Sequence, residues 1–231
     1  MPPDNPTELL LARLRTFCFP GGDEAARRVR AIRTTQRGEI RMSAAARWMP
    51  FTAEETIEAT RSAFRWDARF RGGRLGSFAV TDAYEEGHGR LVVKLAGLIP
   101  VKKTVGPEAD KGELQRYLGG VISCPPMLLN NAALEWTAAG PLTLRLRDRQ
   151  DPTGATVDLD LAEDGCPLAC RAERPRIAGK EIIPTPWSGT GSEVREQEGL
   201  RLATHVEAAW HLPDGAFTYY RSDVTSITLA H

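Results

Sequence analysis

Strict alternation of apolar and polar residues is the feature that most limits how this chain can fold. It runs through Phe64-Arg-Trp-Asp-Ala-Arg-Phe70, Leu142-Thr-Leu-Arg-Leu-Arg147 and Val157-Asp-Leu-Asp-Leu161. Successive side chains of a strand point to opposite faces, so each segment predicts a strand with one dry face and one wet face. Antiparallel sheets tolerate a solvated face, whereas parallel sheets are covered on both. The pattern therefore predicts a mainly β protein built on an antiparallel sheet.

Turn residues separate the predicted strands at short intervals. Residues 75–84 and 90–99 make the clearest hairpin, because the loop Glu85-Glu-Gly-His-Gly89 contains residues that tolerate positive φ. His88 is interpreted as a turn residue, since no partner is predicted to position it for catalysis. Strands at this spacing predict a meander. Further turn signals stand at Asp151–Gly154, Asp164-Gly165, Ala178-Gly179, Gly189–Gly191 and Asp214-Gly215.

Three stretches depart from this simple pattern. We expect residues 40–51 to be extended with a break at Pro50, and the β-branched residues after Thr52 to favour strand over helix. The segment 184–189 is expected to be irregular, either a lid over a cleft or a crossover held by a packed Trp187. Residues 189–192 are expected to form a flexible loop, because they match neither a nucleophile elbow nor a phosphate-binding loop.

Two segments have helical periodicity. Residues 5–19 predict a helix with Asn5 as its cap and Pro6 in its first turn, ended by Pro20 and the two glycines after it. The second helix, 107–123, has one apolar stripe formed by Leu114, Tyr117, Leu118, Val121 and Ile122. We therefore divide the chain into an N-terminal helical appendage, 1–22, and a single antiparallel β half-barrel domain, 23–231.

The dry face of the sheet must pack on something, and helix 107–123 is the sizeable partner that the sequence offers. An antiparallel curved sheet or half-barrel wrapped around one central helix, with an N-terminal helix beside it, is the predicted α+β architecture. This arrangement either encloses a hydrophobic cleft between sheet and helix or fills it completely with side chains. A cleft of this kind is a common setting for an apolar ligand.

Charge and cysteine content exclude several classes of function. Lys and Arg together number 30, as do Asp and Glu, so there is no excess positive charge for nucleic-acid binding. No apolar run is long enough to span a bilayer, and no signal-peptide pattern precedes the first helix, so we expect a cytoplasmic protein. The four cysteines fit no zinc motif and are expected to be free thiols, mostly buried. Oligomeric state is left open.

Four short motifs carry a resemblance to a known family: Trp48-Met-Pro-Phe-Thr-Ala-Glu54, Phe64-x-Trp66-Asp-Ala68, Gly112-Glu-Leu-x-Arg-Tyr-Leu118 and Pro186-Trp187. Over about residues 28–229 the chain resembles a bacterial family of uncharacterised function. The order of strands, one inserted helix and further strands also resembles the half-barrel of LolA/LppX-like lipoprotein carriers. That topological likeness implies a hydrophobic or lipid ligand. It supplies no catalytic residues, because a fold does not determine a function.

The leading hypothesis is non-catalytic binding of an apolar or amphipathic small molecule, such as a lipid, in the cleft. Glu113 and Arg116 are three residues apart on the helix, so they can pair with each other and hold a polar head group; otherwise they form a helix-surface ion pair. No cofactor is expected. The predicted cleft lining consists of Phe64, Trp66, Tyr84, Tyr117, Trp136 and Trp210.

Two alternatives remain open. The first is an enzyme acting on a small hydrophobic substrate, with Asp67, Glu113 or Tyr117 as acid–base groups. The second is a protein-interaction module that uses the N-terminal helix or an open sheet edge. A metal site is not expected: His205 and Glu207 share one face of a predicted strand, but His211 lies too far along it to bind the same ion.

Overall fold

The structure, a computed structural model, describes residues 5–71, 76–96, 99–179 and 181–231. Its main element is one 13-stranded sheet with the order β6-β5-β4-β3-β2-β1-β13-β12-β11-β10-β9-β8-β7. All neighbouring strands pair antiparallel. The strands are β1 Ala31–Ile40, β2 Met49–Glu58, β3 Phe64–Phe70, β4 Phe78–Glu85, β5 His88–Leu95, β6 Ile99–Thr104, β7 Leu134–Gly140, β8 Thr143–Asp148, β9 Thr156–Leu161, β10 Pro167–Ala178, β11 Glu181–Gln197, β12 Leu200–Leu212 and β13 Gly215–Ala230.

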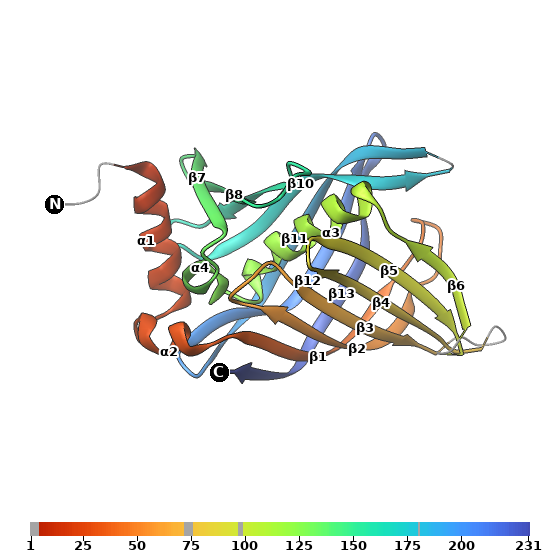
Figure 1. Cartoon of the computed structure of the whole chain (residues 1–231), viewed down its shortest axis with the longest axis horizontal. Coiled ribbons are helices and arrows are strands. Elements are labelled where there is room, and N and C mark those ends of the chain that lie inside the picture. Colours follow the sequence, from red (N-terminus) through yellow and green to blue (C-terminus); the bar gives the residue numbers. More distant parts are fainter. Residues whose placement is uncertain (1–4, 72–75, 97–98, 180) are drawn as a thin grey trace.

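The sheet curves around a central helix, α3 (Pro107–Gly119), which continues as a 3-10 turn, η1 (Gly120–Ile122). Figure 1 shows α3 between the two arms of the open half-barrel. It packs on β4 and β5 from one arm and on β9 and β10 from the other. The predicted curved antiparallel sheet around one helix is confirmed, and the helix predicted over 107–123 is found within one residue of its C-terminal end.

The β4–β5 hairpin is attached to the start of α3. Its turn residues Glu86 and Gly87 have φ of 53° and 83°, as the sequence predicts. A Cβ on Gly89 would lie 2.2 Å from the carbonyl oxygen of Ala109, so this close approach requires glycine. The Gly89 backbone N–H donates a hydrogen bond of 2.7 Å to Asp110 in the first turn of α3. This contact fixes one arm of the sheet against the helix.

Three further helices lie outside this centre: α1 (Pro6–Cys18), α2 (Asp23–Arg28) and α4 (Met127–Asn130). Asn5 caps α1 as predicted, accepting a hydrogen bond from the Thr7 N–H. Helix α1 lies at one end of the sheet (left in Figure 1) and packs on β7, β8 and β12. Its buried residues Leu10, Leu14 and Cys18 belong to the same hydrophobic cluster as the strands. No helix in the described ranges is long and apolar enough to cross a membrane.

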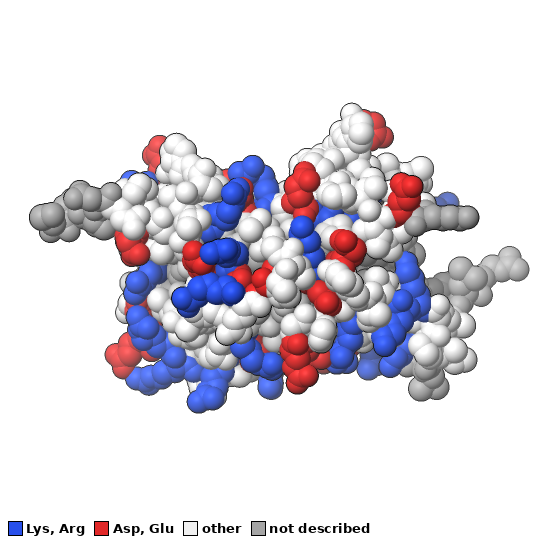
Figure 2. Space-filling model, turned by 45° about the horizontal axis from the view of Figure 1, so that its top comes forward, with Lys and Arg blue, Asp and Glu red and all other residues white. Residues whose placement is uncertain are grey.

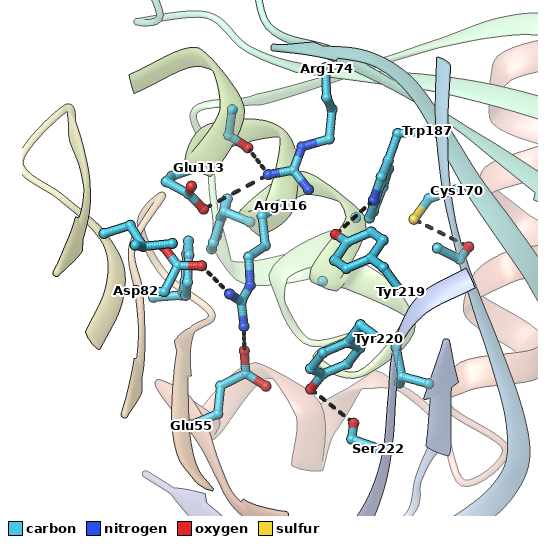
Figure 3. A pocket seen from close by; sticks show the side chains of 18 of the residues that line it. Glu55, Asp82, Glu113, Arg116, Cys170, Arg174, Trp187, Tyr219, Tyr220 and Ser222 are labelled. Atoms are coloured by element: carbon cyan, nitrogen blue, oxygen red, sulfur yellow. Dashed lines mark hydrogen bonds and ion pairs between the residues drawn. The ribbon is translucent and has the colours of Figure 1, made fainter. Parts of the chain in front are cut away.

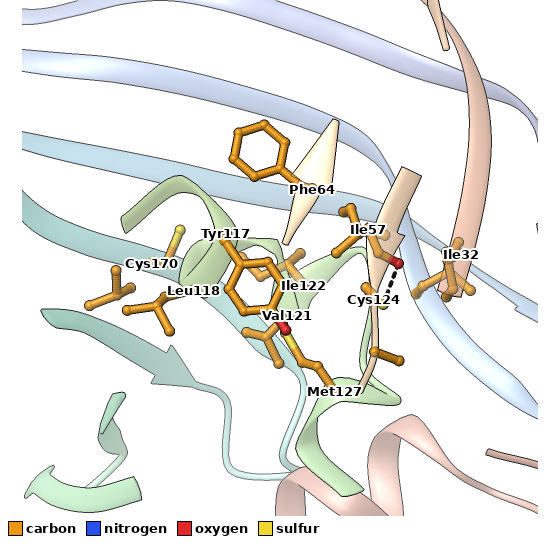
Figure 4. Packing of buried hydrophobic residues seen from close by; sticks show 14 of the residues in the cluster. Ile32, Ile57, Phe64, Tyr117, Leu118, Val121, Ile122, Cys124, Met127 and Cys170 are labelled. Carbon is orange, nitrogen blue, oxygen red and sulfur yellow. Dashed lines mark hydrogen bonds between the residues drawn. The ribbon is translucent and has the colours of Figure 1, made fainter. Parts of the chain in front are cut away.

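The inner faces of the strands and α3 form one continuous core. On β3, the predicted inner residues Phe64, Trp66, Ala68 and Phe70 are all buried. Figure 4 shows the apolar stripe of α3 and η1 packed among residues from β1, β2, β3 and β10. The residues labelled there are Ile32, Ile57, Phe64, Tyr117, Leu118, Val121, Ile122, Cys124, Met127 and Cys170.

The outer face holds paired charges, as the alternation predicts. Arg145 on β8 binds Asp158 on β9 at 2.7 Å, and Arg171 on β10 binds Asp160 at 2.6 Å. Figure 2 shows basic and acidic side chains interspersed on this side of the molecule. Some of the equally numerous positive and negative residues therefore pair with each other across strands on the solvated face of the sheet.

Two local predictions are wrong. Residues 40–51 are not continuously extended: β1 ends at Ile40, β2 begins at Met49, and the connection between them includes Arg41, whose guanidinium donates to the Thr218 carbonyl at 2.7 Å. Residues 184–192 are neither an irregular segment nor a loop, since all of them lie within β11.

The structure explains why prolines and glycines occur within β11. Pro184 lies opposite Pro175, where neither strand pairs with a second neighbour, so a missing N–H can face a free edge. A Cβ on Gly191 would lie 2.2 Å from the Ile122 side chain. Gly191 therefore allows the strand to approach η1, and it does not mark a turn.

Candidate functional site

A cavity of about 540 Å³ lies between α3 and the inner face of the sheet. This volume is within the range of pockets that hold small organic ligands. Its walls are mainly apolar, and three exposed apolar residues, Met42, Ile177 and Ile182, line it as well, so the cavity reaches the surface. Figure 3 shows that charged side chains enter it from α3, β2, β4 and β10. The site is thus an apolar pocket with a charged cluster inside.

Arg116 occupies the centre of this cluster. It forms ion pairs with Asp82 on β4 and with Glu55 on β2, the latter at 3.2 Å. Its guanidinium also lies over the rings of Phe64 and Trp66, 4.8 and 5.2 Å from their centroids. Burial lowers the pKa of Arg116, but Asp82 and Glu55 outweigh this effect and the pKa is raised overall. Arg116 is therefore a fixed cation with two carboxylates of its own.

Glu113 lies one turn before Arg116, yet it does not form the predicted pair with it. Its nearest basic partner is Arg174 on β10, with 3.9 Å between Oε2 and Nη2. The prediction fails because carboxylates on β2 and β4 bind Arg116 from the other side. Burial, helped by the negative charge of Asp82, raises the pKa of Glu113 to about 8, although Arg174 and Arg116 oppose the shift. Glu113 is accordingly mostly protonated at neutral pH.

Arg174 is the second cation of the cavity, and only 8% of its surface is exposed. Its Nη2 donates to the Gly112 carbonyl at 2.7 Å, and its guanidinium lies 4.7 Å from the centroid of the Trp187 ring. The Trp187 indole N–H donates to the Tyr219 hydroxyl at 3.1 Å. Within the described part of the chain, Nε of Arg174 has no hydrogen-bond partner.

Gln36 on β1 organises the opposite wall. Its amide donates to Glu55 at 2.6 Å, while its carbonyl oxygen accepts from Trp66 at 3.1 Å and from the Tyr220 hydroxyl at 3.2 Å. Burial raises the pKa of Tyr220 beyond its usual range, so its hydroxyl stays neutral. This network fixes the orientation of the Glu55 carboxylate that binds Arg116.

The predicted ligand-binding residues fall into two groups. Five of them line the cavity: Phe64, Glu113, Arg116, Tyr117 and Trp210. Trp66 lies behind the lining and donates a hydrogen bond to Gln36. Tyr84, on β4, is buried opposite Phe64 of β3. Trp136 is on β7, in the part of the sheet on which α1 packs. Their role in binding stays a prediction.

The acid–base candidates differ in their access to the cavity. Asp67 points to the outer face, where it binds Arg65 and Thr81, both at 2.6 Å. The Tyr117 hydroxyl is committed, donating to the Glu58 carbonyl at 3.1 Å and accepting from Asn131 at 3.0 Å. Burial raises the pKa of Tyr117, which keeps the phenol neutral. Tyr117 and Glu113 both line the cavity and have raised pKa values, but the pKa of Glu113, about 8, is the one near neutral pH.

The sequence does not predict several polar members of the site, among them Gln36, Glu55, Asp82 and Arg174. Each lies within a strand and lines the cavity. Asp82 gives a usable signal, because it alternates in phase with Phe78, Val80 and Tyr84 on a face that is otherwise apolar. A charged residue on the dry face of a strand needs a partner, which indicates a site.

Metal chemistry receives no support from the described residues, in which no three His, Cys, Asp or Glu side chains gather closely enough to hold an ion. His205 binds Asp223 at 2.6 Å, and His211 lies 2.8 Å from the Ser188 hydroxyl. The four cysteines are free. Burial raises the pKa of Cys170, which lines the cavity, to about 11, so it is a neutral thiol there.

Comparison with protein families now places the chain. Residues 16–222 match the model of a family of unknown function, DUF6544. The protein belongs to this family. The predicted membership of an uncharacterised family is thereby confirmed, and no curated protein matches the sequence.

Solved structures show the same fold at very low sequence identity. A LolA superfamily protein from Nitrosomonas europaea aligns with a TM-score of 0.50 and 9% identity over 97% of this chain and 94% of its own. A DUF1329 protein from Desulfovibrio piger gives 0.53 and 8% over 97% and 93%. A domain from Vibrio parahaemolyticus, named for outer membrane lipoprotein sorting, gives 0.50 and 8% over 86% and 85%. DUF6544 thus shares the LolA-like half-barrel, as the topology predicts.

Proposed function

We propose that this DUF6544 protein binds one apolar or amphipathic molecule, such as a lipid, in the cavity between α3 and the sheet, without transforming it. The observation that supports this most strongly is the cavity of about 540 Å³ in a position that the fold could have filled with side chains. Protein interiors are normally packed as densely as organic crystals, so a space of this size is exceptional for a core. It favours a ligand over a structural role.

The chemistry of the walls supports an amphipathic ligand. Apolar surface from Ile57, Phe64 and Trp210 gives an extended chain a dry environment. The charged and polar side chains of the lining, Arg174 among them, give a polar head group its partners. The exposed Met42, Ile177 and Ile182 provide an apolar path from the surface.

The comparisons agree with this proposal at the level of the fold. One structural neighbour is named for lipoprotein sorting, which fits a hydrophobic ligand. At 8% identity the similarity extends to the fold alone, so the proposal depends on the cavity of this chain.

Blocking the cavity tests the proposal. Val206 on β12 lines it, and the next residue, Glu207, has a side chain 43% exposed. We expect the apolar probe N-phenyl-1-naphthylamine to fluoresce on binding the unmodified chain, and Val206→Trp to abolish the signal by filling the space. Glu207→Trp adds the same ring outside and should leave the signal unchanged. Equal binding by all three chains would contradict the proposal.

A second candidate, an enzyme acting on a hydrophobic substrate, is favoured by Glu113 alone, since a carboxyl group with a raised pKa in a cavity suits general acid–base chemistry. It predicts that substrate added to the protein is converted, and that Glu113→Gln stops the conversion while leaving substrate binding intact. Recovery of chemically unchanged ligand after long incubation would exclude it for that ligand.

A further inference from the structure

Arg116 and Arg174, two arginines that line the cavity, differ in how their charge is balanced. Arg116 binds both Asp82 and Glu55, so its surroundings hold more negative than positive charge. Arg174 has one carboxyl group nearby, Glu113, at 3.9 Å, which is too long for a hydrogen bond. Its other contacts, the Gly112 carbonyl and the Trp187 ring, are uncharged. Of these two arginines, Arg174 is therefore the one without a hydrogen-bonded counter-ion.

Leaving a buried charge in this state is costly unless something pairs with it. Arg174 is 8% exposed, and within the described residues its Nε has no acceptor. The guanidinium lines the cavity, in which Figure 3 shows it beside Glu113 on one side and Trp187 on the other. An anion inside the cavity would supply the counter-charge that Arg174 lacks.

We propose that the ligand of this cavity carries a single anionic group, a carboxylate or a phosphate ester, that binds Arg174, while its apolar chain lies along the walls near Trp210 and Phe64. This inference rests on the proposed function and adds the chemical class of the ligand. An anion on a guanidinium forms charge-assisted hydrogen bonds, which are stronger than neutral ones. A neutral or cationic amphiphile would leave Arg174 without a bonded counter-ion.

Protonation of Glu113 makes this pairing depend on pH. Glu113 faces Asp82 from β4, Arg174 from β10 and Arg116 on its own helix, and its pKa is about 8. Below that pH it is protonated and does not repel a bound anion. Above that pH it becomes a carboxylate beside Arg174, which neutralises the cation and repels the ligand. Anion affinity should therefore fall above about pH 8, by up to roughly tenfold per pH unit.

Matched twelve-carbon amphiphiles test the inference on the full chain. Dodecanoate, dodecyl phosphate and dodecan-1-ol are titrated at pH 7 below their aggregation limits. We expect either anion to bind roughly 10- to 100-fold more tightly than the alcohol, the range that hydrogen bonds to a charged group provide. The preferred anion separates carboxylate from phosphate-ester recognition. Equal affinity for all three would overturn the inference and leave the proposed function standing, whereas no binding of any would overturn both.

Two variants locate the effect. Arg174→Met should reduce the ratio of dodecanoate to dodecanol affinity to near one. Arg171→Met, on the outer face of the same strand, removes a surface partner of Asp160 and should keep that ratio. An unchanged ratio in Arg174→Met would contradict the inference.

If Arg174→Met does not fold, Glu113→Gln decides the question, because an amide at this position cannot ionise. Its dodecanoate affinity should stay constant from pH 7 to 9 while that of the unmodified chain falls. Parallel pH profiles for the two chains would overturn the assignment of Arg174 and Glu113 to the head-group site.

Discussion

The two ends of the half-barrel use the same alternating pattern to build opposite interiors. Where α1 packs on β7 and β8, most of the interior is aliphatic, and Leu144, Leu146, Val157 and Leu159 on β8 and β9 are completely buried. The inward face of β8 ends with one buried carboxylate, Asp148. Between α3 and the strands β1 to β4 and β10 to β13, inward positions include Gln36, Glu55, Asp82 and Arg174, and a cavity remains. We call these the packed end and the cavity end.

The comparison shows that the type of inward residue decides whether the interior is filled. Aliphatic side chains interdigitate and leave no room. Charged side chains require particular partners at particular distances, and Arg116, which Asp82 and Glu55 bind, lies in the cavity wall. A polar residue on the dry face of a strand therefore indicates a functional site better than the alternating pattern of the strand does.

The largest expected effect is at the cavity end. Arg116→Met removes the cation that Asp82 and Glu55 share and leaves two buried carboxylates unpaired. Breaking a buried ion pair in this way should lower the free energy of unfolding by about 3–5 kcal/mol at pH 7. Urea denaturation of the variant and the unmodified chain at pH 7 measures the loss, and a loss below about 1 kcal/mol would contradict the account.

Truncating one leucine at each end compares the two interiors directly. Leu146→Ala, in the packed end, should cost about 2–5 kcal/mol of unfolding free energy because it creates a void. Leu91→Ala, in the cavity wall, enlarges an existing space and exposes less new surface, so we expect less than about 1.5 kcal/mol. Denaturation of both variants under one set of conditions measures the difference. Equal losses would mean that the cavity end is as well packed as the other.

The pKa of Glu113 predicts a pH effect on stability with a definite sign. Because burial raises this pKa to about 8, the folded chain holds a proton that the unfolded chain releases near the ordinary value of 4.5. Stability from this group is therefore fully present below about pH 4.5 and is lost as pH rises to about 8. The difference in unfolding free energy between the unmodified chain and Glu113→Gln isolates it. A flat difference between pH 5 and 8 would contradict the assignment.

The smallest effect is expected on the outer face. Arg145→Ala breaks the ion pair with Asp158, but the arginine side chain is 50% exposed. Exposed pairs are weak, so the change in unfolding free energy should be about 0–1 kcal/mol and should decrease with added salt. A loss as large as that of Arg116→Met would show that inner and outer pairs do not differ as proposed.

The sequence predicts the fold better than the site. Alternation in residues 64–70, 142–147 and 157–161 identified inner and outer faces, and the helix at 107–123 identified what the sheet surrounds. The glycines and prolines in β11 predict breaks, but Gly191 allows contact with η1 and Pro184 lies at an unpaired strand edge. Such contacts depend on elements distant in sequence.

The site was only partly predictable for the same reason. Glu113 and Arg116 were found because they share a helix, but their true partners, Arg174, Asp82 and Glu55, come from three different strands. The spacing of residues within one helix cannot show which strand arrives beside it. Asp82 and Glu55 could have been suspected as charged residues on inward positions, whereas their pairing with Arg116 requires the curvature of the whole sheet.

A crystal structure of the chain grown with saturating dodecanoate tests the central claim most directly. The account predicts one molecule between α3 and the sheet, with its carboxylate within hydrogen-bond distance of Arg174 and its chain beside Trp210 and Phe64. A cavity that stays free of dodecanoate at saturation, or a molecule bound only outside it, would contradict the account.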